Sequence, residues 1–165
     1  MIGGTARHFE KTGLGSRVTR EQAIQYLDDM VDHGLIPATQ NYMTGKFGIM
    51  CLCCGCCCSN VRGRTLWDNP TAMLPSPFIP IAGDECVQYE TCIDRCMLGA
   101  LRLDEEEEKV VVDAEKCIGC GVCAIACPTE ALKLRRVDRP EKPFDTDVEW
   151  YMTVAQDNNP VSYTH

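Results

Sequence analysis

Two stretches of the chain show a regular pattern of apolar and polar residues. Apolar residues at positions 23, 24, 27, 30 and 31 follow the spacing of a helical face, which predicts a helix from about residue 20 to 33. Thr19 and Gln22 form a T-x-x-Q capping box at its start, and Gly34 stands where a C-terminal cap belongs. In residues 101–113 (LRLDEEEEKVVVD), alternating or β-branched residues flank an acidic run, which predicts a β-hairpin turning at residues 104–108.

The remaining segments lack this periodicity. Residues 1–18 are glycine-rich, and we expect a flexible or partner-docked arm there. The prolines at 70, 75, 77 and 80 disfavour regular helix and central strand, so residues 61–83 are interpreted as an extended connector. The predicted organisation is an arm (1–18), a capped helix with a cysteine-rich segment (19–60), the connector (61–83), a repeat domain (84–136) and an extended C-terminal tail (137–165).

Composition and charge narrow the class of protein. The 165 residues, 45% of them hydrophobic, allow one domain or one domain with an extension. A net charge of -8 argues against a nucleic-acid surface, which needs concentrated Lys and Arg. No stretch approaches the ~18 apolar residues of a membrane span, and the first residues have no apolar signal region. We therefore expect a cytoplasmic protein.

Thirteen cysteines dominate the candidate chemistry. In a reducing compartment, dense cysteine is better interpreted as metal binding than as a disulfide framework, and an odd total suits complete pairing poorly. Part of the set forms an internal repeat: Cys86, Cys92 and Cys96 recur 31 positions later as Cys117, Cys123 and Cys127. The apolar pair at 100 and 101 recurs at 131 and 132.

The second copy of the repeat is the most specific motif, Cys117-x-x-Cys120-x-x-Cys123-x-x-x-Cys127-Pro128. A C-x-x-C-x-x-C loop delivers three thiolates to one iron-sulfur cluster, which needs four ligands. Gly119 and Gly121 flank Cys120, where small residues let backbone N–H groups approach the cluster sulfurs. Zinc is the alternative for four close cysteines, but structural zinc normally takes two separated C-x-x-C pairs.

Residues 84–134 thus resemble the bacterial two-cluster ferredoxins. The resemblance implies an α+β, ferredoxin-like fold of two β-hairpins and short helices with a pseudo-two-fold axis, here extended by an N-terminal helix and the cysteine-rich segment. In that family the last cysteine of each motif crosses to the other cluster. The resemblance therefore implies Cys96 as the fourth ligand beside Cys117, Cys120 and Cys123, and it places Cys127 with Cys86 and Cys92.

The first copy of the repeat is incomplete, because Tyr89 stands opposite Cys120. Three hypotheses remain: a three-iron (3Fe-4S) cluster, a four-iron (4Fe-4S) cluster with a substitute ligand, or a lost cluster whose cysteines stay as small buried residues. A thiol from residues 51–58 is one source of the substitute. We interpret Tyr89 itself as a packing residue rather than an iron ligand.

The N-terminal run, CLCCGCCC, holds six cysteines: Cys51, Cys53, Cys54, Cys56, Cys57 and Cys58. Within the run, Cys51, Cys54 and Cys57 satisfy C-x-x-C-x-x-C, and Cys58 is a further candidate ligand. A third cluster is the predicted use, so the chain would hold two to three clusters. Zinc or a labile group of thiols is the alternative.

Residues 20–136 together resemble the iron-sulfur subunits of strict anaerobes, such as the electron-transfer subunit of class II benzoyl-CoA reductase. That resemblance implies a carrier of single electrons to or from a larger oxidoreductase subunit in a hetero-oligomer. The alternatives are an assembly subunit with mainly structural clusters, or a cluster with an open iron that acts on substrate. His8, His33 and His165 are scattered and predict no catalytic group.

Overall fold

The computed structural model describes residues 3–39, 49–139 and 143–157. The chain divides into two compact units. The flanking unit comprises Met1–Ser16, Thr39–Met50 and Lys142–His165, and the cysteine unit comprises Arg17–Ala38 and Cys51–Glu141. All thirteen cysteines lie in the cysteine unit, so every candidate ligand belongs to one compact body. No helix in the described part of the chain is long and apolar enough to cross a membrane.

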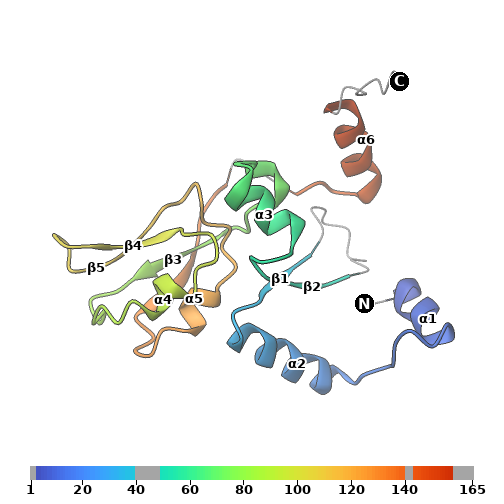
Figure 1. Ribbon diagram of the computed structural model, residues 1–165, viewed down its shortest axis with the longest axis horizontal. Helices are drawn as coiled ribbons and strands as arrows, with labels where there is room; N and C mark the ends of the chain where they lie inside the picture. The colour runs from blue at the N-terminus through green and yellow to red at the C-terminus, as the bar shows by residue number, and fades with distance from the viewer. Residues whose placement is uncertain (1–2, 40–48, 140–142, 158–165) are drawn as a thin grey trace. The chain divides into compact units, whose positions relative to one another are not determined.

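The cysteine unit begins with the predicted helix, α2 (Arg20–Asp32; Figure 1). Both halves of the capping box form: the Gln22 amide donates to Thr19 Oγ1 at 3.2 Å, and the Thr19 amide donates to Gln22 Oε1 at 2.9 Å. At the other end Gly34 adopts φ +86°, and its amide donates to the Val31 carbonyl at 2.8 Å. The Leu35 amide donates to the Met30 carbonyl at 3.0 Å, which completes a Schellman cap.

The N-terminal run links a strand to a helix. Strand β1 (Ile36–Ala38) pairs antiparallel with β2 (Cys51–Cys53), and Ile36 lies opposite Cys53. A turn follows, and helix α3 (Ser59–Leu66) begins directly after Cys58. The run therefore starts in a strand, bends at Gly55 and ends at a helix N-terminus, which spreads its thiols over several directions.

Residues 61–83 hold more regular structure than the extended connector that the prolines suggested. They include most of α3, a short 3-10 helix η1 (Pro70–Ala72) and strand β3 (Phe78–Ala82). Pro70 is tolerated because it opens η1, where its missing N–H is not needed. Pro80 is tolerated because β3 belongs to a two-stranded sheet, so one of its edges makes no ladder hydrogen bonds.

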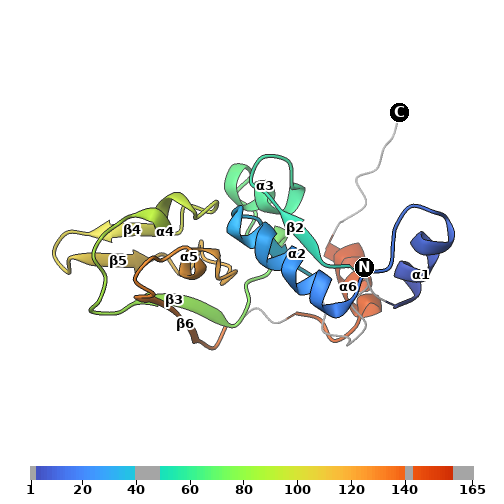
Figure 2. The ribbon, with the colours of Figure 1, turned by 90° about the horizontal axis from the view of Figure 1, so that it is seen from below.

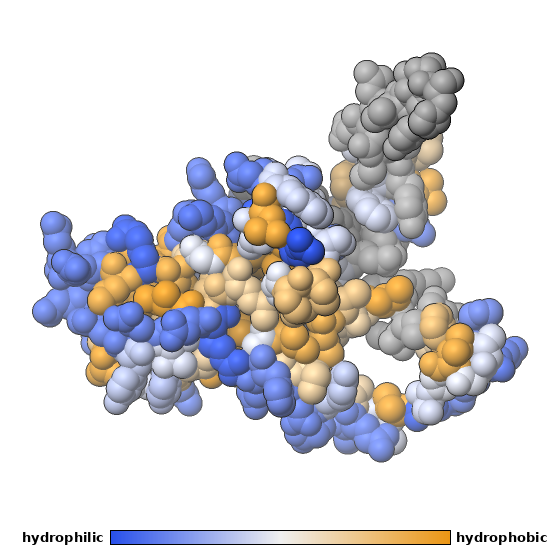
Figure 3. All heavy atoms as spheres, in the orientation of Figure 1, coloured by the Kyte–Doolittle hydropathy of each residue, from blue (hydrophilic) through white to orange (hydrophobic). Residues whose placement is uncertain are grey.

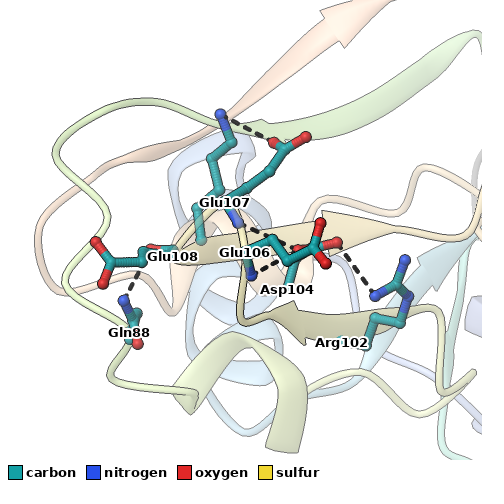
Figure 4. Close-up of polar contacts among 7 residues, drawn as sticks. Gln88, Arg102, Asp104, Glu106, Glu107 and Glu108 are labelled. Atoms are coloured by element: carbon teal, nitrogen blue, oxygen red, sulfur yellow. Dashed lines mark hydrogen bonds and ion pairs between the residues drawn. The ribbon is translucent and has the colours of Figure 1, made fainter.

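The predicted hairpin is confirmed as β4 (Leu101–Asp104) and β5 (Lys109–Val112), paired antiparallel. Asp104 closes the turn, because its Oδ1 accepts the amides of Glu106 and Glu107 at 3.1 and 3.2 Å (Figure 4). These N–H groups hold the pKa of the Asp104 carboxyl below its usual range. Hydrophilic residues cover this end of the unit in Figure 3, as expected for a solvated acidic turn.

The two sequence copies also match in backbone conformation. Helices α4 (Thr91–Asp94) and α5 (Val122–Ile125) start at residues 91 and 122, the spacing of the cysteine repeat. The left-handed backbone positions of the two copies match as well: 88 with 119, 90 with 121 and 99 with 130. The second copy ends in β6 (Leu132–Arg136), which pairs antiparallel with β3 (Figure 2).

Two clusters of buried residues form the core of the cysteine unit. The first contains Val31, Ile36, Cys53, Val61, Met73, Ile118 and Val122, with Cys58, Met97 and Cys120 packed against it. The second contains Cys92, Leu101, Val110, Cys123 and Leu132, with Cys86, Cys96 and Cys127 packed against it. Cysteines thus take the interior positions that large apolar side chains fill in an ordinary domain of this size.

The flanking unit holds two helices that the sequence pattern did not predict, α1 (Gly3–Lys11) and α6 (Asp147–Asp157). Thr146 Oγ1 accepts the Glu149 amide at 3.0 Å and caps the start of α6. Asp147 and Glu149 in the first turn favour that helix by their charge. The arm and the tail therefore each contain regular structure.

Candidate metal centre

Within the described residues, no cysteine is paired in a disulfide. The repeat domain holds seven thiols, which we divide by the family resemblance into two groups. We call Cys96, Cys117, Cys120 and Cys123 the closed set, and Cys86, Cys92 and Cys127 the open set. These are the two groupings that the resemblance to two-cluster ferredoxins implied.

The closed set combines one cysteine from the first copy with three from the second. Burial raises the pKa of the Cys120 thiol, and the nearby charges of Cys96 and Cys117 raise it further. Burial raises the pKa of Cys123 to about 12, and Cys120, Cys96 and Cys117 add to the rise. The four sulfur atoms are therefore close enough to repel one another electrostatically once ionised.

The loop of the closed set requires glycine at position 119. Gly119 has φ +67°, and a Cβ there would lie 2.2 Å from the Phe78 carbonyl oxygen and 2.4 Å from Ser76 Oγ. Ser76 holds the loop in place: its Oγ donates to the Gly119 carbonyl at 2.8 Å, and its amide donates to the Ile118 carbonyl at 2.9 Å. The strand β3 region thus fixes the loop that presents Cys117 and Cys120.

Backbone N–H groups point at the sulfur atoms of the closed set. The Gly119 amide donates to Cys117 Sγ at 3.4 Å, and the Ala100 amide donates to Cys96 Sγ at 3.4 Å. Buried thiols with raised pKa values ionise only when a positive group replaces their protons, as metal binding does. Four converging sulfur donors with N–H groups directed at them fit a thiolate-bound metal group.

The open set supplies three sulfur donors. Burial raises the pKa of the Cys92 thiol, and the charges of Cys127 and Cys86 contribute to the rise. Cys127 is different: burial would raise its pKa, but hydrogen bonds from the Leu132 amide and from Thr129 outweigh that effect and lower it. The Cys127 sulfur lies 3.7 Å from Thr129 Oγ1.

Tyr89 does not pack where the missing fourth thiol would stand. Its side chain is 67% exposed, so the interpretation of Tyr89 as a packing residue is wrong. Its neighbours Gln88 and Glu90 adopt φ +56° and +57°, the conformation that Gly119 and Gly121 adopt in the second copy. The first copy therefore keeps the shape of a cluster loop while it presents a phenol in place of a thiol.

The N-terminal run forms an outer group of three thiols. Cys54 Sγ lies 2.7 Å from Cys56 Sγ and 3.2 Å from Cys57 Sγ, and all three sulfur atoms lie within 4.8 Å of one another. Hydrogen bonds from Cys56 and then Cys57 lower the pKa of Cys54 to about 6. The spacing motif paired Cys54 and Cys57 with Cys51, whereas the structure adds Cys56, because Cys51 lies in strand β2.

Cys53 and Cys58 form a second, inner pair in the run. Cys53 is buried in the first core cluster, and burial followed by its contact with Cys58 raises its pKa to about 12. The Gly55 amide donates to Met97 Sδ at 3.0 Å, and Met97 directly follows Cys96 of the closed set. The run therefore lies beside the closed set.

The described cavity at Tyr89 is lined by residues 86–92, 110 and 127–129, with no thiol of the run among them.

The two described histidines, His8 and His33, have contacts away from these groups. His33 Nδ1 lies 2.6 Å from the Asp29 carbonyl oxygen at the end of α2, and the His8 ring contacts the Phe9 ring edge-on. His165 lies outside the described residues. Two residues near the cysteines, Met97 and Arg139, belong to no recognisable motif, and their positions are visible only in the fold.

Comparison with known proteins identifies the cofactor. Residues 110–133 match the 4Fe-4S binding domain family. The polyferredoxin-like subunit of aliphatic sulfonate oxidoreductase from Pyrococcus furiosus is 34% identical over 83 residues, 47% of each chain. Pyruvate synthase subunit PorD from Methanothermobacter marburgensis is 40% identical over 53 residues, 32% of this chain and 59% of the relative. The beta subunit of dissimilatory-type sulfite reductase from Archaeoglobus fulgidus is 32% identical over 88 residues, 50% of this chain and 24% of the relative.

The chain thus spans about half the length of the polyferredoxin-like relative and between a quarter and three fifths of the other two. No solved structure matches it. The matched segment contains Cys117, Cys120, Cys123 and Cys127, the sulfur donors of the second copy. The fold is a small unit of helices and strands that carries a 4Fe-4S binding domain, and its cofactor is an iron-sulfur cluster.

Proposed function

We propose that this chain is an electron-transfer subunit that relays single electrons between a donor and a larger oxidoreductase subunit. One observation carries the proposal: the charge of Cys96, from the first copy, acts on the thiols of Cys120 and Cys123 in the second copy, as does the charge of Cys117. Bound there, a 4Fe-4S cluster supplies a one-electron carrier. The protein's contribution is to bury Cys117 and Cys123, to half-bury Cys96 and Cys120, and to direct the N–H groups of Gly119 and Ala100 at sulfur.

The open set holds the second cluster in this proposal. Support comes from the matching backbone of the two copies and from the pairing of β3 with β6 and of β4 with β5. Such an arrangement suits the pseudo-two-fold fold of two-cluster ferredoxins. Because Cys86, Cys92 and Cys127 are three donors, and the run lies beside the other set, we favour a three-iron cluster or a four-iron cluster with one open iron.

We infer that the closed set, the open set and the N-terminal run lie close enough together to relay electrons. The charge of Cys92 in the open set contributes to the raised pKa of Cys123 in the closed set, and both residues lie in the second core cluster. On the other side, Met97 links the closed set to Gly55 of the run. We propose that the run holds a third metal group, for which Cys51, Cys54, Cys57 and Cys58 are the ligands that the sequence suggests and Cys56 the one that the structure adds.

The partner is expected to be a larger redox subunit, as in the complexes that the names of the relatives describe. A tungsten-containing catalytic subunit of the class II benzoyl-CoA reductase kind is one such partner. Exposed apolar side chains near the open set and on α5, Tyr89, Val87 and Ile125, support a docking role in a cytoplasmic hetero-oligomer.

The replacement Cys96→Ser tests the crossing ligand. We expect the anaerobically prepared variant to lose the reducible 4Fe-4S signal of the closed set, because its first-copy ligand is gone. The unsubstituted chain, prepared in parallel, is the control, since every other cysteine is itself a candidate ligand. Iron content and low-temperature paramagnetic resonance are the measurements. A Cys96→Ser protein with the same iron content and spectrum as the control would contradict the ligand assignment.

One observation favours a second function. A cavity lies at the open set beside Tyr89, and an iron with an open position can act as a Lewis acid on substrate. Slow, stoichiometric binding of a small ligand to that iron, seen as a spectral change, would support it.

If the clusters are instead purely structural, as in an assembly subunit, they will not cycle between two oxidation states.

A further inference from the structure

Arg139 reaches from the segment after β6 back to the loop of the closed set. Its Nη1 donates to the Ala114 carbonyl at 2.9 Å, and its Nη2 donates to the Phe78 carbonyl at 3.3 Å. The third nitrogen of the guanidinium, Nε, is buried and has no hydrogen-bond partner among the described residues. Two backbone contacts thus fix the plane of a cation whose Nε–H has no acceptor in the described polypeptide.

Both anchoring carbonyls belong to the surroundings of Cys117. Ala114 lies three residues before Cys117, and the Phe78 oxygen is the atom that a Cβ at position 119 would meet at 2.2 Å. These two contacts hold the guanidinium beside the loop that presents Cys117. The pKa of Cys117 agrees with this position: burial raises it, while the Gly119 amide and then the charge of Arg139 oppose that rise.

We propose that Arg139 tunes the cluster of the closed set: its buried Nε–H donates to sulfur at the Cys117 corner, and its charge raises the reduction potential of that cluster alone. The inference rests on the proposed iron-sulfur cluster at this set. A buried N–H without an acceptor is costly in a native protein, and an anionic sulfur supplies one. Arginine suits this role because it stays protonated and holds a rigid planar geometry.

The direction of the effect follows from charge. One-electron reduction adds a negative charge to the cluster, so a fixed neighbouring cation and an N–H donor stabilise the reduced state more than the oxidised state. The equivalent position in the first copy, 31 residues earlier, is Glu108. Its carbonyl accepts Gln88 Nε2 at 2.9 Å, which brings the acidic turn to the loop of the open set (Figure 4). The two copies therefore carry opposite charges at this position.

The test is a redox titration, followed by paramagnetic resonance, of the full chain loaded with iron and sulfide. Arg139→Gln removes the charge, and Arg139→Lys keeps it without the fixed Nε donor. Arg136→Gln is the matched control, because Arg136 is exposed on β6 and its guanidinium lies 5.9 Å from the ring centroid of Phe78, the residue whose carbonyl accepts from Arg139. Iron content and circular dichroism of each variant establish that it folds and loads.

We expect Arg139→Gln to lower one midpoint potential by at least about 59 mV, a tenfold change in the ratio of reduced to oxidised cluster. Arg139→Lys should lower it less, and Arg136→Gln should change it little. Equal shifts in both clusters, or a shift for Arg139→Gln no larger than for Arg136→Gln, would overturn the role of Arg139. If Arg139→Gln does not bind its clusters, Arg139→Lys provides the comparison. A shift in midpoint potential for Arg139→Lys that is no larger than the shift for Arg136→Gln would then overturn the role of Arg139. A wild-type chain without any titratable signal would instead refute the proposed function.

Discussion

At the scale of single residues, Gly119 shows how backbone conformation and space together fix a cluster loop. Its φ of +67° and the 2.2 Å approach of the Phe78 oxygen leave no room for a side chain. Gly99 offers a matched control, because it has φ +59° and a Cβ added there would meet nothing within 4 Å. Its equivalent in the second copy, Glu130, carries a side chain at φ +53°.

We predict that Gly119→Ala lowers the iron content of the protein and that Gly99→Ala leaves it unchanged. Both substitutions cost about 1–2 kcal/mol for the left-handed conformation, but only Gly119→Ala also forces the loop away from β3. Iron and sulfide analysis after anaerobic reconstitution, with urea unfolding of each variant, provides the comparison. Equal iron content and equal stability in the two variants would show that the contact with Phe78 does not constrain the loop.

Tyr89 tests the open set at the same scale. The replacement Tyr89→Cys restores the fourth thiol at the position equivalent to Cys120, on a loop that already has the left-handed residues of the second copy. If the open set holds a three-iron cluster, we expect about one additional iron per chain and loss of the paramagnetic signal of the oxidised state. Tyr89→Phe, which keeps the size of the ring, is the control. An oxidised-state signal that survives in Tyr89→Cys would contradict a missing ligand at residue 89.

At the scale of elements, the caps of α2 were predictable because they depend on residues a few positions apart. Thr19 and Gln22 form the expected reciprocal bonds, and Gly34 adopts the left-handed conformation of a C-terminal cap. The β4–β5 hairpin was predictable for the same reason. Helix α6 follows local rules too, since Thr146 caps it, but the apolar period that would have indicated it is weak.

We predict that Thr19→Ala weakens the first turn of α2 by about 1 kcal/mol, because the hydroxyl that accepts the Gln22 amide is lost. Amide hydrogen exchange at Gln22 should then be faster by about fivefold. Thr19→Ser retains an oxygen acceptor and should keep the exchange rate near that of the wild type. Similar protection of Gln22 in the alanine and serine variants would mean that the hydroxyl contributes nothing to the cap.

Strand β3 and the arrangement of the run were harder to predict, because both depend on contacts between distant residues. Prolines suggested an extended connector, yet residues 78–82 pair with a strand at least 50 residues further along the chain, β6. In the run, C-x-x-C spacing identified Cys54 and Cys57, but it could not show that Cys53 faces the core while Cys56 joins the outer thiols. C-x-x-C spacing cannot distinguish adjacent cysteines. The strand and the turn that follows it give their side chains different directions.

At the scale of the whole molecule, the distribution of thiols explains how a chain of this size builds its cysteine unit. Cysteines occupy both core clusters, so bound metal would join the two copies of the repeat where apolar side chains are few. The charge of Cys96 acts on Cys120 of the other copy, and the charge of Cys127 acts on Cys92. The repeat and the resemblance to two-cluster ferredoxins suggested these groups, whereas the positions of Arg139 and Met97 depend on the fold.

We propose that the closed and open sets each hold an iron-sulfur cluster. The most direct measurement is the iron and sulfide content of the anaerobically purified chain, with paramagnetic resonance spectra before and after reduction by dithionite. We predict at least about seven irons per chain with reducible signals, and about eleven or twelve if the run holds a third cluster. About four irons would leave the closed set as the only cluster site, and zinc without a reducible signal would contradict the account.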